Sequence, residues 1–176
     1  MFELTEKTKA RLVEVAVLSQ KGRKPDESPG AKLTVEMTLA NHVLIHFDGR
    51  LRGALFEKAT GGDQLDGVEA VSDLPSLTGI GAKLGTFKWN HDLSGYGFTI
   101  IYGTGRSDSN IAIEDCKLSG WRITGKEGGT VVLKFNVESA NVTEGQFGKM
   151  AHLKARDIEL TLTPPDVNEQ ADLAGD

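Results

Sequence analysis

Residues 118–137 read LSGWRITGKEGGTVVLKFNV, and this stretch decides the fold. Apolar residues take every second position in its second half: Val131, Leu133, Phe135 and Val137. A period of two is typical of a strand with one buried face. Gly125-Lys-Glu-Gly-Gly129 supplies a turn before that strand. Residues 118–124, which include Trp121, supply another strand before the turn. The stretch therefore predicts an antiparallel β-hairpin.

Further strands are predicted on both sides of this hairpin, where apolar and β-branched residues cluster or alternate: 12–18, 33–39, 84–89, 96–102, 111–113 and 158–162. Helical spacing predicts a helix over 41–56, which Asn41 can cap. Thr143 and Gln146 form a capping box for a second short helix. Residues 59–66 are read as a glycine-rich loop, 68–71 as a short strand and 74–82 as irregular chain.

The predicted fold class is mainly β, and α+β in detail. We expect a single-domain antiparallel sandwich or partly open barrel of about eight strands with two short helices. The order hairpin, helix, further chain occurs twice, and both hairpins end in an Ala-Asn pair, at Ala40-Asn41 and Ala140-Asn141. We interpret this as a repeat of topology.

The chain has 176 residues, 39% of them hydrophobic and 26% charged, which suits one folded domain over 1–163. Residues 164–176 form a predicted flexible acidic tail. Four acids follow Pro164-Pro165, so the body alone is close to neutral although the whole chain carries a formal charge of −5. No apolar stretch is long enough for a membrane span, and the N-terminus has no secretory pattern. With Cys116 as the single cysteine, we expect a cytoplasmic protein without disulfides.

Motifs for catalysis or metal binding are absent from the sequence. His42 and His46 share a helical face, but the glutamate of a His-Glu-x-x-His site is missing. Residues 79–85 resemble a phosphate loop without its Gly-Lys-Ser/Thr ending, and a turn explains them better. The charges of Glu114 and Asp115 would raise the pKa of Cys116 and weaken it as a nucleophile. We therefore predict no enzyme, no metal and no cofactor.

Basic residues interleave with aromatic ones along the predicted sheet. A sheet face with aromatics beside cations is a common way to hold single-stranded nucleic acid. The predicted nucleic-acid-binding residues are Lys21, Arg23, Lys24, Lys88, Trp89, Tyr96, Tyr102, Arg106, Trp121, Arg122 and Lys126. Lys117 and Lys134 are further cations of the same sheet. The alternative is that the aromatics belong to the core and that the cations are ordinary solvated side chains.

A resemblance adds to this interpretation. Residues 84–89, 95–100, 126–137, Gly148-Lys149 and 158–162 resemble a group of small phage and prophage proteins, most of them uncharacterised. Such proteins tend to be encoded among replication and recombination genes. The resemblance implies a non-enzymatic accessory in DNA metabolism, with single-stranded DNA and phage or host replication and recombination proteins as partners. We expect a homo-oligomer that does not contact a membrane and that, if it is phage-encoded, works in the host cytoplasm. The alternative is a virion or tail component, or a module that binds and inhibits a host protein.

Overall fold

The computed structural model describes residues 2–18, 30–59, 73–103 and 109–165. The strands are β1 (Leu4–Leu18), β2 (Gly30–Ala40), β3 (Phe56–Glu57), β4 (Ser76–Leu77), β5 (Thr86–Trp89), β6 (Leu93–Ile101), β7 (Ile111–Lys126), β8 (Thr130–Ser139) and β9 (Arg156–Thr163). The helices are η1 (Asn41–His46, a 3-10 helix), α1 (Leu51–Leu55), α2 (Gly79–Leu84) and α3 (Glu144–Leu153). The polar stretch 20–30 between the first two predicted strands is expected to be an extended hairpin tip, and all of it but Gly30 lies outside the described residues. Most of the loop and strand predicted over 59–71 and the acidic tail after Pro165 also lie outside them.

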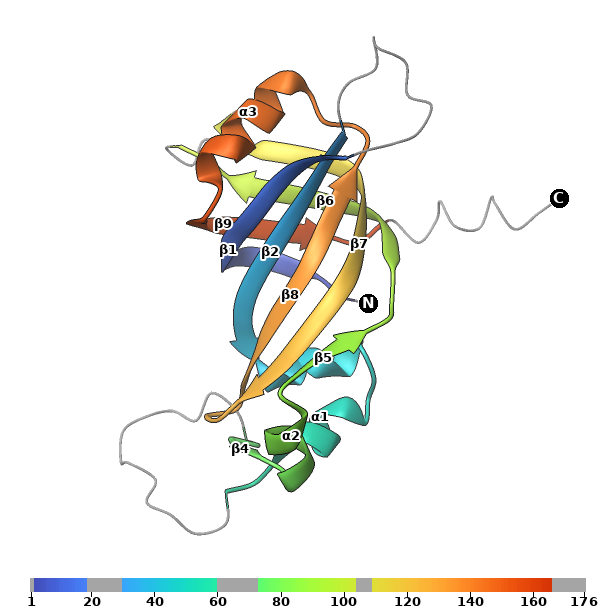
Figure 1. The fold of residues 1–176 in the computed structure, drawn as a ribbon, viewed down its shortest axis with the longest axis vertical. Coiled ribbons are helices and arrows are strands. Elements are labelled where there is room, and N and C mark those ends of the chain that lie inside the picture. Colours follow the sequence, from blue (N-terminus) through green and yellow to red (C-terminus); the bar gives the residue numbers. More distant parts are fainter. Residues whose placement is uncertain (1, 19–29, 60–72, 104–108, 166–176) are drawn as a thin grey trace, which may run out of the picture.

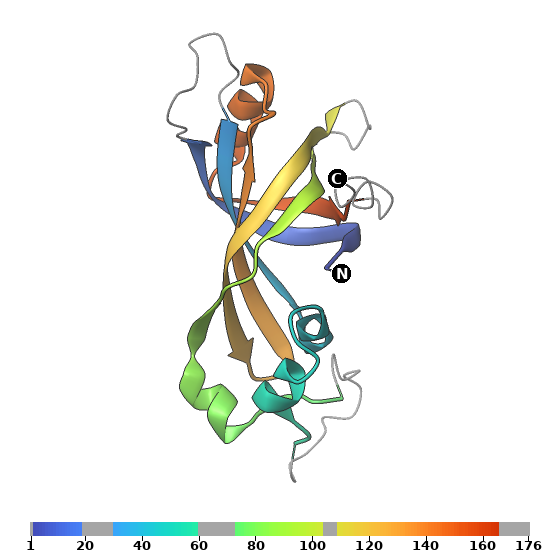
Figure 2. The same ribbon diagram turned by 90° about the vertical axis from the view of Figure 1, so that its right-hand side faces the viewer.

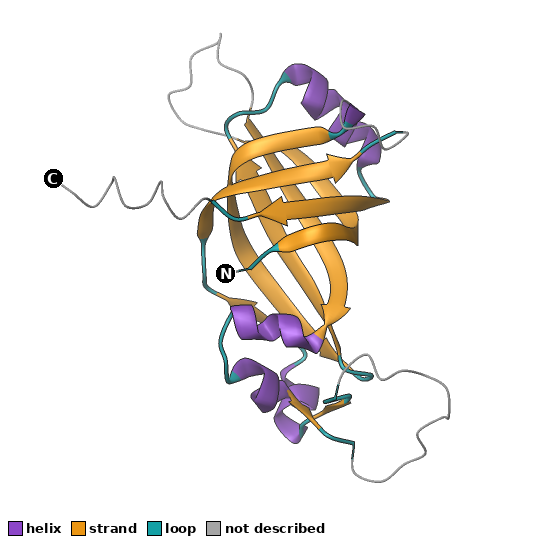
Figure 3. Ribbon diagram, turned by 180° about the vertical axis from the view of Figure 1, so that it is seen from behind, coloured by secondary structure: helices purple, strands orange, loops and turns teal. Residues whose placement is uncertain are grey.

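Seven strands form one antiparallel sheet in the order β5-β7-β6-β9-β1-β2-β8, and a further pairing of β7 with β8 closes it into a ring. β6 pairs with the first half of β7, while β5 pairs with its second half along the same edge. Figure 1 shows the long strands of the hairpins running the length of the molecule, with α3 at one end and α1 and α2 at the other. The view from behind shows the remaining strands of the ring (Figure 3). The expectation of a mainly β sandwich or partly open barrel is confirmed.

Apolar side chains at alternating positions of the strands fill the interior of the ring. On β8, Val131, Leu133, Phe135 and Val137 are all at most 1% exposed, while the residues between them face outward. This is what the pattern of residues 118–137 predicts for a strand with one buried face. The strand following 111 and the strand over 118–124 are one continuous β7 rather than two, and β1 begins at Leu4 rather than at residue 12.

The two predicted repeats are related by the pairing of the sheet. The first consists of β1, β2, the helical segment and β6, and the second of β7, β8, α3 and β9. β2 pairs with β8 and β6 with β9, while β1 pairs with β9 and β7 with β6. Exchanging the two repeats leaves this list of pairs unchanged, so the topology has an approximate twofold symmetry. Figure 2 shows the helical segments of the two repeats at opposite ends of the ring.

The helical segments differ in part from the prediction. The capping box of α3 is confirmed, because Thr143 accepts from the Gln146 backbone and Gln146 from that of Thr143. The helix predicted over 41–56 is two short helices, η1 and α1. α2 was not expected, although the Thr78 hydroxyl caps it by accepting from Gly81 N at 3.0 Å.

Asn41 is not a helix cap, which corrects that prediction. Its side chain is fully buried, and its Nδ2 donates to the carbonyl of Leu74 at 2.7 Å. Its Oδ1 accepts from Arg52 Nε at 3.0 Å, and its backbone N–H donates to Gly129 O at 2.9 Å. The side chain of Asn41 therefore ties η1 to α1 and to Leu74, and its backbone ties η1 to the turn between β7 and β8.

Candidate nucleic-acid interface

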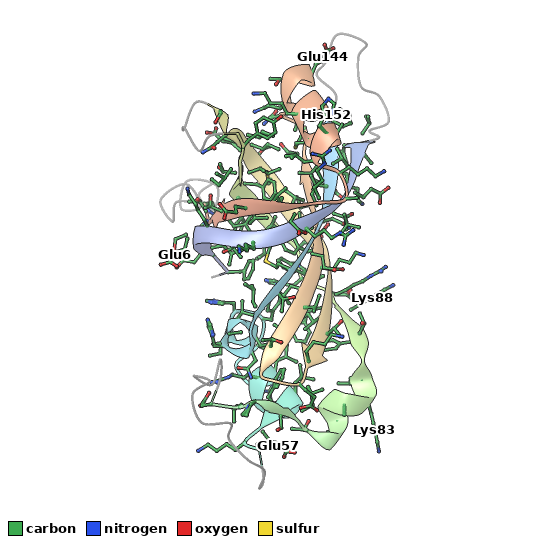
Figure 4. The ribbon with its side chains drawn as sticks, turned by 90° about the vertical axis from the view of Figure 1, so that its left-hand side faces the viewer. Glu6, Glu57, Lys83, Lys88, Glu144 and His152 are labelled. Atoms are coloured by element: carbon green, nitrogen blue, oxygen red, sulfur yellow. The ribbon has the colours of Figure 1, made fainter. Side chains whose placement is uncertain are left out.

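Three cations lie side by side on the outer face of the sheet. Lys88 on β5 is directly opposite Arg122 on β7, and Arg122 is directly opposite Lys134 on β8. They face outward because their neighbours along β7 and β8, Trp121 and Phe135, point into the ring. Lys88 projects from β5 away from the strands of the ring in Figure 4. We call Lys88, Arg122 and Lys134 the cationic row.

The cationic row is only partly neutralised by the protein itself. Lys134 Nζ lies 3.8 Å from Glu36 Oε2 on β2, the strand that follows β8. Lys88 and Arg122 form no ion pair with any described residue, although both are exposed. Elsewhere on the sheet, Lys32 and Lys117 are each paired with a carboxylate at 2.8 Å. Like charges directly opposite in a sheet are destabilising, so an anion bound across the row would relieve a repulsion of the free protein.

A hollow of about 410 Å³ opens beside the row, and strands β1, β2, β5, β7 and β8 line it. Its side-chain lining combines the three cations with Trp89, Asn90, Asn136, Thr34 and one acid, Glu14. A second hollow of about 390 Å³ adjoins it and shares Trp89, Asn90 and Gly120. Half-buried Trp89 therefore borders both hollows, one of which is also bordered by cations, although its side chain points to the inner face of the sheet, opposite to that of Lys88.

A β-bulge opens the larger hollow. The register of β7 on β8 shifts between Ser119 and Arg122, where Gly120 and Trp121 together face Phe135. Gly120 has φ +64°, a conformation that glycine adopts readily and that defines this type of bulge. A Cβ at position 120 would lie 2.7 Å from Nδ2 of Asn136. The backbone conformation thus favours glycine, and a side chain at position 120 would also displace the amide of Asn136.

Two aromatic residues of the predicted interface belong to the core instead. Trp121 is 1% exposed and stacks on Phe135 at 4.4 Å between ring centroids, with Phe2 and Phe47 against its edges. Tyr96 is also 1% exposed, and burial raises its pKa, with a smaller contribution from Glu3. The prediction that these two rings contact nucleic acid is wrong, because neither can reach a base in the folded protein.

The remaining nine predicted residues divide into four groups. Lys88, Trp89 and Arg122 come together at the hollow. Tyr102 lies elsewhere, with Lys149 Nζ 5.8 Å from its ring centroid, and lines a separate hollow with Lys7 and Lys9. Lys126 is exposed beside the turn between β7 and β8. The other four, Lys21, Arg23, Lys24 and Arg106, lie outside the described residues.

The prediction missed three residues of this site. Lys134 was named only as a cation of the sheet, yet it completes the row, and Gly120 and Asn136 were not considered. The hairpin turn could have predicted the position of Lys134. Lys126 and Thr130 are opposite each other at the turn, and a step of four residues away from the turn on each strand places Arg122 opposite Lys134. No local signal in the sequence marks Gly120 as a bulge rather than a turn.

The described part of the chain carries potential metal ligands and one thiol. No three His, Cys, Asp or Glu residues there are grouped so as to hold a metal ion. Burial, with a contribution from Asp115, raises the pKa of the Cys116 thiol to about 12, in the direction that the sequence predicts. The thiol is therefore protonated at neutral pH and is a poor nucleophile. None of the described helices has the length and apolar character that crossing a membrane requires.

Comparisons with protein-family models, with curated proteins and with solved structures found no match to this chain. We therefore infer the function from the geometry of the cationic row and of the hollow beside it.

Proposed function

We propose that the protein binds single-stranded DNA, with the backbone across the cationic row and a base against Trp89. One observation carries the proposal: Lys88, Arg122 and Lys134 lie directly opposite one another on three strands, and two of them have no acidic partner among the described residues. Backbone phosphates supply the missing negative charge. Half-buried Trp89 lines the same hollow as the row from the inner face of the sheet, and stacking of a base on its ring would contribute about 1–3 kcal/mol.

In this proposal the protein is a non-enzymatic accessory of phage-type DNA replication or recombination, as the sequence resemblance implies. It works in the cytoplasm, as a homo-oligomer that presents several such faces to one strand. The near-neutral body suits a local site, because steering by the net charge of the whole chain would repel DNA.

Fluorescence anisotropy of a labelled thymidine oligonucleotide tests the proposal. The double variant Lys88→Ala/Arg122→Ala should lose most of the affinity at low salt. The control variant Lys7→Ala/Lys9→Ala removes the same charge from exposed positions on β1 beside Tyr102. It should bind nearly as tightly as the original protein. No binding at low salt, or an equal loss in both double variants, would overturn the proposal.

A second candidate is a protein-binding module, and the end of the sheet favours it. β5 pairs with β7 alone among the described strands, so its other edge is open to an extended peptide of a partner. Ile80 and Leu84 on the neighbouring α2 are 65% and 47% exposed. Size-exclusion chromatography with light scattering separates the candidates, since long assemblies without DNA binding would favour a virion or tail component.

A further inference from the structure

The hollow beside the cationic row has a structured floor as well as a charged rim. At the floor, Gly120 leaves open the space that a side chain would fill, and Nδ2 of Asn136 occupies its edge. Oδ1 of Asn136 accepts from the Thr34 hydroxyl at 3.1 Å. In this arrangement the Asn136 oxygen accepts from β2, and the NH2 group lies toward Gly120.

The groups that face the hollow are mainly hydrogen-bond donors. Nδ2 of Asn136 has no hydrogen-bond partner among the described residues, and it carries two N–H donors. Arg122 and Lys134 add further donors from the same two strands, with positive charge. Glu14, from β1, is the one acid of the lining. Such a set suits an anion with several oxygen atoms better than it suits the edge of a base, which presents donors and acceptors together.

We propose that this hollow is a phosphate subsite, in which Arg122, Lys134 and Asn136 donate to the oxygens of one phosphate of the DNA backbone. This inference rests on the proposed function and adds that one phosphate has a fixed position on the sheet. Thr34 is a positioning residue in this site, because it touches Asn136 rather than the phosphate. The bulge at Gly120 gives the phosphate access to the amide.

Inorganic phosphate is the probe for the subsite. Titrated against the protein with chloride adjusted to hold the ionic strength constant, it should raise the melting temperature. It should also displace the labelled oligonucleotide at lower concentration than acetate does. Equal effects of phosphate and acetate would overturn the inference in favour of a general carboxylate or charge effect.

Asn136→Asp is the decisive variant. It keeps the size of the side chain and the acceptor for Thr34, but it replaces the donor with an anionic oxygen. Phosphate affinity should fall about tenfold or more, the factor that corresponds to one lost charge-assisted hydrogen bond. Asn141→Asp makes the same chemical change at an exposed position after β8 and should leave phosphate affinity unchanged. Equal losses in the two variants would contradict the subsite.

The role of Thr34 has its own test. Thr34→Val removes the hydroxyl at nearly constant shape and should weaken phosphate binding, while Thr34→Ser should restore it. Both variants are expected to melt near the temperature of the original protein, because Thr34 is only half-buried. If the valine variant binds phosphate as the serine variant does, Thr34 does not position the amide.

The outcomes separate the subsite from the proposed function. DNA binding that phosphate does not displace, and that Asn136→Asp does not weaken beyond Asn141→Asp, would overturn the subsite and leave the proposed function standing. Phosphate binding without DNA binding would overturn the proposed function and keep the subsite as a site for a phosphate-bearing small molecule. Absence of both would overturn both.

Discussion

Trp89 and Trp121 lie directly opposite each other on β5 and β7, yet only Trp121 is enclosed by the core. Trp121 is packed among Phe2, Phe47 and Phe135, whereas Trp89 is half-buried at the end of a four-residue strand. These are the only tryptophans of the chain. The pair therefore gives two fluorescent reporters with different access to solvent and to ligand.

Quenching of tryptophan emission by an oligonucleotide should come from Trp89 alone. In Trp89→Phe the remaining emission of Trp121 should be resistant to iodide and unchanged by DNA, because its ring is buried. Affinity measured by anisotropy should fall in the same variant by about one base-stacking contribution, roughly five- to a hundredfold. Emission of Trp89→Phe that is still quenched by DNA would contradict this assignment.

Arg122→Thr should stabilise the protein while weakening DNA binding. Threonine suits a strand, and its introduction removes two like-charge contacts, with Lys88 and Lys134. The free energy of unfolding in urea should rise by about 0.5 kcal/mol. The plot of log K against log salt for single-stranded DNA should become shallower by about 0.7, since one cation fewer meets a phosphate.

Arg11→Thr is the matched control for that charge effect. Arg11 is exposed on β1 and lies directly opposite two acids, Glu36 and Asp157. The same substitution there removes favourable cross-strand pairs, so stability should fall and the salt dependence of DNA binding should stay as it is. A gain in stability from Arg11→Thr would mean that the change reports strand propensity rather than charge.

Much of the fold could be predicted because local patterns carry it. The turn at Gly128-Gly129 and the alternation after it are enough to define the hairpin of β7 and β8. Alternation also places Trp121 in phase with buried Ile123, and Tyr96 in phase with buried Phe98. The error of assigning these two rings to the interface could thus have been avoided by applying the same rule one step further.

The candidate site depends on information that the sequence does not carry locally. β5 and β7 pair across about 35 residues of chain, so no turn between them sets the register that brings Lys88 to Arg122. The contact of Asn136 with Thr34 joins residues 102 positions apart. Helix α2 was missed because Gly79 and Gly81 are poor helix formers, and Gly81 is selected by its close approach to the Leu55 carbonyl.

Asn41→Ala should destabilise the protein strongly. The variant leaves the Leu74 carbonyl and Arg52 Nε without the hydrogen bonds that the buried amide supplies. Each lost buried partner costs about 1–3 kcal/mol, so a loss of at least about 2 kcal/mol in urea unfolding is expected. Asn141→Ala is the control, at the matching position after β8, where the side chain is exposed and the change should stay within about 0.5 kcal/mol. Similar losses in both variants would show that the Asn41 network adds little.

Stability should fall in alkaline solution in a way that Cys116 governs. The folded protein holds the thiol proton up to a pKa of about 12, whereas the ordinary pKa of a cysteine thiol, as in an unfolded chain, is 9.0. Below pH 9.0 both states keep the proton, so the thiol adds no pH dependence. Between these two values the unfolded chain loses its proton while the folded protein keeps it. The free energy of unfolding therefore decreases as pH rises, by about 1.4 kcal/mol per pH unit from this group.

Cys116→Ser isolates that contribution, because a serine hydroxyl does not ionise in this range. Any difference in stability at neutral pH is a constant offset, so the slope above pH 9.0 is the quantity to compare. Tyr96, whose pKa burial also raises, is present in both proteins and cancels in the comparison. Urea unfolding at several pH values above 9.0 should give a steeper decline for the original protein than for the serine variant. Parallel declines would mean that the thiol is ionised inside the folded ring, and that the packing around Cys116 admits water.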